Sequence, residues 1–92
     1  MMASFRQDYL ALLESRVDTV CRLVAAEQVE PARVALLSLE SSSAMLGVDE
    51  LVVAARQLRA ALGDGRHDAL DPLVAQLVSE ADAARARLDR SS

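Results

Sequence analysis

The chain has 92 residues and a formal net charge of −4, and its composition is 52% hydrophobic but only 2% aromatic. A chain of this length forms one small domain, whose core has to be built from leucine, valine and alanine. All ten basic residues are arginines, and they are interspersed with 14 acidic residues. Because no basic stripe is present to neutralise phosphates, the composition argues against nucleic-acid binding.

The residue usage also indicates a compartment. Cys21 is the only cysteine, so the chain cannot form an internal disulfide. No apolar stretch approaches the roughly 18 residues of a membrane span, and the N-terminus lacks the pattern of a secretory signal. Arginine without lysine, together with abundant alanine, is typical of a GC-rich bacterial genome. We therefore predict a bacterial, cytoplasmic protein that does not bind membranes.

Two helices are expected in the first half of the chain. The first is predicted over about 4–28, because apolar residues recur there at spacings of three and four: Leu10, Leu13, Val17, Val20 and Val24. Pro31 suits the first turn of a second helix over about 31–46, where its missing N–H costs nothing. Gly47 is expected to end that helix in the left-handed conformation.

Two more helices are expected in the second half. A helix over about 49–62 carries a buried stripe and ends at the Gly63–Gly65 turn. Asp71 and Pro72 form a cap and first-turn pair, which predicts the last helix over about 72–89. The connections are short, so neighbouring helices should run antiparallel. The expected fold is all-α: one domain over 1–92, an antiparallel up-down-up-down four-helix bundle.

The segment from Leu36 to Gly47 carries a recognisable pattern. It closely resembles the signature helix of histidine-containing phosphotransfer (HPt) domains, which reads His, any residue, Leu, Lys, a small residue, several more small residues, then Leu-Gly. Leu39 matches the leucine of this pattern, and Leu46 with Gly47 matches its closing pair. The small positions are occupied by Ser41, Ser42, Ser43 and Ala44. The resemblance covers essentially the whole chain and implies a four-helix relay module of bacterial multistep signalling.

Two positions depart from this pattern. The alignment puts Leu37 at the position of the phosphate-accepting histidine and Glu40 at that of the usual lysine. Phosphoryl transfer needs an imidazole nitrogen as nucleophile, and a leucine side chain has no atom that can carry the group. Glu40 also reverses the charge that would offset the phosphate. The resemblance therefore implies a domain without phosphotransfer activity, hence no enzyme, no catalytic residue and no cofactor.

A helical wheel at about 100° per residue divides this helix into two faces. The predicted core face holds Ala35, Leu39, Ser42 and Leu46. The opposite face should be exposed, and it carries Arg33, Leu37, Glu40, Ser41 and Ala44. Two interpretations of Leu37 are open: a harmless degenerate position, since scattered exposed leucines are ordinary, or the centre of a protein-contact site. We predict a partner-binding surface composed of Arg33, Val34, Leu37, Glu40, Ser41 and Ala44.

The other reactive side chains give weaker evidence for a functional site. His67 is the only histidine and is expected in a surface loop at the end of the bundle, although it has to be considered as a displaced phosphate acceptor. Without a second histidine or a cysteine nearby, it does not predict a metal site. Cys21 is expected to be half-buried in a helix. The three serines at 41–43 have no visible base to activate them.

The leading hypothesis is a non-catalytic adaptor of bacterial two-component or phosphorelay signalling. The resemblance implies docking to a response-regulator receiver domain or a histidine kinase, and Leu37 would allow binding without phosphate transfer. One alternative is a structural helical module that forms a homodimer or docks in a larger assembly. A further alternative is a phosphotransfer protein that uses His67. The chain is expected to be a monomer or a weak homodimer.

Overall fold

The structure, a computed structural model, describes the backbone of residues 2–90 and the side chains of residues 11–87. Over the described residues every regular element is an α-helix. The elements are α1 (Met2–Ala25), α2 (Val29–Met45), α3 (Asp49–Gly63) and α4 (His67–Arg90). The all-α prediction is thereby confirmed.

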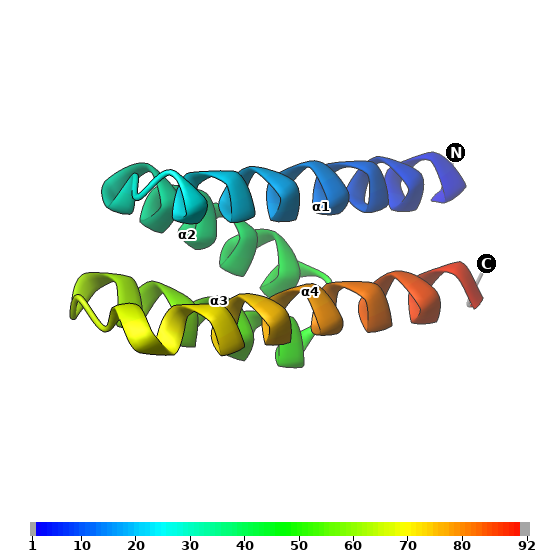
Figure 1. Cartoon of the computed structure of the whole chain (residues 1–92). Helices are drawn as coiled ribbons and strands as arrows, with labels where there is room; N and C mark the ends of the chain where they lie inside the picture. Colours follow the sequence, from blue (N-terminus) through cyan, green and yellow to red (C-terminus); the bar gives the residue numbers. More distant parts are fainter. Residues whose placement is uncertain (1, 91–92) are drawn as a thin grey trace.

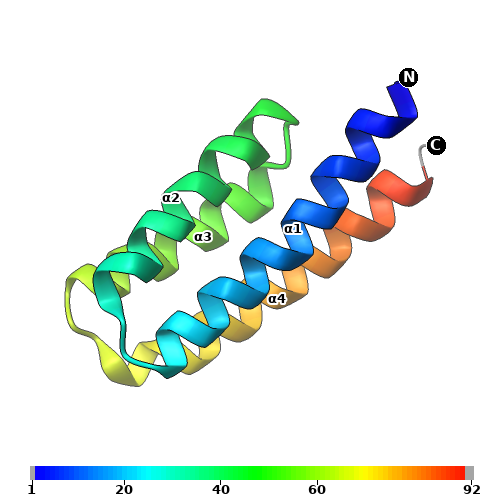
Figure 2. The same ribbon diagram turned by 90° about the horizontal axis from the view of Figure 1, so that it is seen from above.

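The four helices form an antiparallel bundle in which each packs against its neighbours in chain order and α4 returns to α1. Figure 2 shows α2 and α3 as one pair and α1 and α4 as the other, with the two chain ends at the same end of the bundle. The bundle is 42 Å long and 18 Å wide in both other directions. Since α1 and α4 have 24 residues each, they continue past the connection between the shorter α2 and α3 (Figure 1).

The three connections use one motif. At each helix end the residue after the cap is left-handed: Glu27 with φ 59°, Gly47 with φ 73° and Gly65 with φ 69°. After α2, the amide of Gly47 donates to the carbonyl of Ala44 (3.1 Å) and that of Val48 to the carbonyl of Ser43 (3.0 Å). This is the paired bonding of a Schellman cap, and it confirms the expected role of Gly47. Glu27 takes the same conformation with a side chain, so α1 ends at Ala25, before the expected residue 28.

The last helix differs from expectation at its start. We predicted it from Pro72, but α4 begins at His67, and Pro72 lies inside it. Leu70 packs against the core and so fixes a turn before the proline. Pro72 removes one backbone hydrogen bond near the N-terminus of the helix, where the freed carbonyl of Asp68 belongs to an exposed residue. Packing of the preceding turn therefore outweighs the local start signal of Asp71 and Pro72.

The core consists of leucine, valine and alanine from all four helices. Its largest fully buried side chains are Leu13, Val20, Leu36, Leu39, Leu51, Leu58 and Leu77. Alanines occupy the close approaches between them: Ala32, Ala54, Ala55 and Ala84 are at most 1% exposed. Small side chains let the helix axes come close, and the leucines fill the layers between them. This core holds α2 with one face against α3 and leaves its other face open.

Candidate functional site

The outer face of α2 carries the residues singled out in the sequence. Leu37 is 51% exposed and Val34 is 67% exposed, and Ser41 and Ala44 are exposed beside them. The hydroxyl of Ser41 donates to the carbonyl of Leu37 (3.1 Å), so it is turned back onto the helix and leaves the surface mainly apolar. The wheel was therefore right that Leu37 is an exposed apolar residue in the middle of a helix.

A shallow hollow adjoins Leu37 at the seam between α2 and α3. Glu30, Arg33, Val34 and Leu37 line it from α2, and Arg59 lines it from α3. The guanidinium of Arg33 donates to the carboxylate of Glu30 (3.2 Å). The two aliphatic side chains thus form an apolar centre with an arginine on either side.

Arg33 is held in place by the end of α3. A Cβ built on Gly63 would lie 3.4 Å from the guanidinium carbon of Arg33, so this side chain lies directly over the last residue of α3. The last turn of α3 contains no basic residue of its own. A guanidinium at a helix C-terminus interacts favourably with the exposed carbonyls there. Arg33 therefore belongs both to the hollow and to the contact between the two helices.

The prediction that Glu40 faces solvent is wrong. Its side chain is only 8% exposed and points to α3. Arg59 donates its Nε–H to one carboxylate oxygen (2.5 Å) and an Nη2–H to the other (3.3 Å), and the Nε of Arg56 lies 3.5 Å away. Glu40 follows the buried Leu36 by four residues and precedes the buried Ser43 by three, so it lies at the edge of the core-facing stripe.

This burial changes the electrostatics of the α2 face. The carboxylate of Glu40 is compensated by two arginines and so does not present a bare negative charge beside Leu37. The hydrogen bond and the charge of Glu40 raise the pKa of Arg59, which keeps its guanidinium ionised. The predicted negative charge of Glu40 on the α2 surface is therefore absent. Glu40 instead belongs to an ion cluster whose arginines extend toward the surface.

The predicted core face of α2 was rotated slightly from the real one. Leu39 is fully buried as expected, but Leu46 is 37% exposed, and Ala35 and Ser42 are half-buried. Leu36 and Ser43, both 0% exposed, lie in the core instead. The rotation of α2 about its axis is set by two neighbouring helices, because α2 packs against both α1 and α3. The hydroxyl side of α2 meets α1, where Arg16 donates to Ser38 and, over 3.5 Å, to Ser42.

Arg56 and Arg59 were not predicted from the sequence as site residues. Both lie within two residues of Leu58, which belongs to the buried stripe of α3. The helical periodicity therefore predicts that they border this stripe. Their partner could not be predicted in this way, because Glu40 lies 16 and 19 residues away on another helix. Only the register between α2 and α3 brings the three side chains together.

His67 lies away from this face. It is the exposed first residue of α4 and not a loop residue, and its amide donates to the carbonyl of Gly65 (3.0 Å). It borders a small hollow with residues of the α1–α2 connection, at the end of the bundle. Nothing in this arrangement brings it to Leu37, which lies in the middle of α2.

No group of three or more histidine, cysteine, aspartate or glutamate side chains in the described part of the chain could hold a metal ion. No helix among the described residues combines the length and apolar character that a membrane span requires.

Comparisons with known proteins bear on the whole chain. Searches of curated proteins and of solved structures give no match. The family model described as Hpt domain matches residues 4–87, which span all four helices and the face around Leu37. The protein therefore belongs to the Hpt domain family.

Proposed function

We propose that this protein is a non-catalytic Hpt adaptor, which binds a receiver domain or a histidine kinase through the α2 face and accepts no phosphate. Hpt domains are phosphotransfer modules of phosphorelay signalling, and they interact with histidine kinases and response regulators. The observation that carries the proposal is Leu37, half-exposed at the position that the resemblance assigns to the phosphate-accepting histidine.

The chemistry of this position supports the loss of transfer. A leucine side chain has no lone pair with which to attack a phosphoryl group. The chain contains a single histidine, His67, and it lies at the end of the bundle. The hydroxyl of Ser41, one turn from Leu37 on the same face of α2, donates to a backbone carbonyl.

The composition of the face supports retained binding. Val34 and Leu37 are exposed aliphatic residues next to each other along the helix, bordered by Arg33 and Arg59. An apolar centre with charged residues around it is a common arrangement in protein–protein interfaces. Glu40 supports this face from below, since its ion cluster fixes α2 against α3.

The test is a binding measurement with receiver domains and kinases from the same organism. Leu37→Asp should weaken binding of the partner by about tenfold or more, because it places a charge in the apolar centre. The matched control is Val53→Asp, which introduces the same charge at a valine that is 47% exposed on α3, beside α4. Equal loss in both variants, or none in either, would remove Leu37 from the interface.

Phosphate transfer is measured separately. Incubation with a phosphorylated receiver domain should leave no acid-labile phosphate on the protein. Stable transfer to the wild-type chain contradicts the proposal, and transfer that disappears in His67→Ala would establish the alternative in which His67 is the acceptor. A dimer in sedimentation velocity that dissociates in Leu37→Asp would favour the homodimeric module instead.

A further inference from the structure

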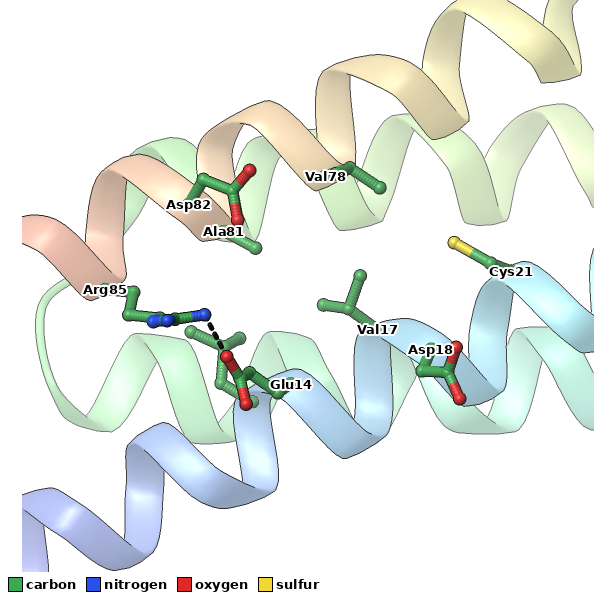
Figure 3. A pocket seen from close by; sticks show the side chains of 9 residues that line it. Glu14, Val17, Asp18, Cys21, Val78, Ala81, Asp82 and Arg85 are labelled. Carbon is green, nitrogen blue, oxygen red and sulfur yellow. Dashed lines mark hydrogen bonds and ion pairs between the residues drawn. The ribbon is translucent and has the colours of Figure 1, made fainter.

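A second hollow lies on the opposite side of the bundle, between α1 and α4 (Figure 3). It has a volume of about 260 Å³. Leu13, Val17 and Ala81 form a buried apolar floor, and Val78 is 36% exposed above it. Cys21 is half-buried at the end of the hollow in Figure 3 that lies away from Glu14. Among the neighbouring helix pairs, α1 and α4 contact each other least, although they are the two longest helices.

The rim of this hollow is acidic on both walls. Asp18 lies on α1 and Asp82 on α4, and an ion pair between Glu14 and Arg85 crosses the hollow at one end (Figure 3). Asp18 is paired with Arg22 on the outer surface of α1 (2.9 Å). Asp82 forms no ion pair with the side chains that the structure describes. Three carboxylates and one guanidinium line the hollow. Glu14 is paired with Arg85 and Asp18 with Arg22, so the excess negative charge comes from Asp82.

We propose that this hollow, termed here the α1–α4 groove, binds an amphipathic helix of another protein that carries arginine or lysine on both sides of an apolar stripe. The groove runs between two antiparallel helices, and a third helix can lay its apolar residues along such a seam. Asp82 on the α4 wall forms no ion pair with a described side chain, and Asp18 on the α1 wall is held only by an exposed pair with Arg22. Exposed pairs are weak, so both carboxylates favour positive charges on the flanks of the bound helix. This surface is separate from the α2 face and does not depend on the proposed function.

The charges also argue against a second copy of the chain as the occupant. A symmetric dimer places the same surface of both copies in contact. The lining of each copy, with three carboxylates and one arginine, would then meet the same excess of carboxylates, and like charges at an interface are costly. A basic helix meets no such repulsion. The charge pattern thus distinguishes between the two kinds of partner.

The test uses the full chain and a synthetic helical peptide of about 18 residues, with leucines along one face and arginines on both flanks. A matched peptide replaces the arginines by glutamates. Titration followed by amide NMR shifts should give perturbations along α1 and α4 with the arginine peptide only. Cys21, the only thiol of the chain, provides a second readout, because a bound helix should slow its alkylation.

Variants of the rim sharpen the test. Asp18→Asn combined with Asp82→Asn should weaken binding of the arginine peptide about fivefold, and added salt should weaken binding to the wild type. Leu37→Asp, on the other side of the bundle, should leave the affinity unchanged. Equal binding of the two peptides, unchanged affinity in the double variant, or NMR shifts centred on α2 and α3 would each overturn the proposal. So would a dimer in sedimentation that dissociates in Val78→Asp, since the groove would then bind a second copy.

Discussion

Ion pairs join the helices at two seams on opposite sides of the bundle, one between α2 and α3 and the other between α1 and α4. The two seams differ in how far these ion pairs are buried. At the first, the carboxylate of Glu40 is buried and two arginines of α3 reach it. At the second, Glu14 and Arg85 form a pair in which both side chains are at least half exposed. Burial makes the first pair part of the helix contact, whereas solvent screens the second.

The two seams also differ in the charged residues that lie beside their apolar side chains. The α2 face has an apolar centre between Arg33 and Arg59, and the α1–α4 groove has an apolar floor between Asp18 and Asp82. On the proposed function, the two surfaces would favour different partners, because their charged residues differ.

The largest expected effect concerns packing at the two seams. Leu39→Ala should lower the free energy of unfolding by about 3 kcal/mol, because Leu39 is fully enclosed and its removal leaves a dry cavity. Leu13→Ala should cost less, about 2 kcal/mol, because Leu13 lines the groove and water can enter the space. Denaturant unfolding monitored by circular dichroism measures both. Equal losses would mean that the two seams are equally closed.

A smaller effect should separate the two ion pairs. Glu40→Ala should lower Tm by about 5 °C, since it leaves Arg59 without its partner at a largely buried contact. Glu14→Ala should change Tm by only about 1 °C, because both members of its pair are exposed. Thermal unfolding at low ionic strength tests the contrast. A comparable drop in both variants would show that burial of Glu40 adds nothing to its interaction.

The smallest effect concerns the thiol in the groove. Burial raises the pKa of Cys21, and the nearby charge of Asp18 raises that pKa further. Less thiolate is present at a given pH than for an exposed cysteine, so alkylation should be slow. Asp18→Asn should move the midpoint of the alkylation rate to lower pH, although burial should keep it above that of an exposed cysteine.

The matched control for this prediction is Asp82→Asn. Asp82 lines the same groove from α4, but the shift of the Cys21 pKa comes from burial and from Asp18. The alkylation midpoint should therefore stay where it is in the wild type. A similar downward move in both variants would mean that Cys21 responds to the total charge of the groove and not to its neighbour on α1.

Local sequence signals predicted some elements well. The spacing of Leu13, Val17 and Val20 identified the buried face of α1, and Gly47 identified the end of α2. Both depend on a few neighbouring residues: a helical repeat in one case and a backbone conformation open to glycine in the other. The pair Asp71 and Pro72 is the counterexample, because a good local start signal lost to the packing of Leu70 one turn earlier.

In the candidate site, too, local signals predicted some features and tertiary packing decided others. The pattern from Leu36 to Gly47 was enough to recognise the family and to predict that Leu37 is exposed. The placement of Leu37 at the acceptor position stays a prediction from the resemblance. Exposure of Leu37 follows from the phase of its own helix. The burial of Glu40 was predicted wrongly because its helical position lies between the buried and the exposed face of α2. At such a position the neighbouring helix determines whether the side chain is buried.

What the residues along the chain determine is thus the helical repeat, the end of α2 at Gly47 and the absence of an imidazole from α2. These depend on bonds and side chains within a few residues of one another. The partners of Glu40 and the acidic walls of the α1–α4 groove arise only when separate helices come together. Arg59 reaches Glu40 across one seam, and Arg85 reaches Glu14 across the other, because the packed core sets the distance and register between helices that the sequence leaves free.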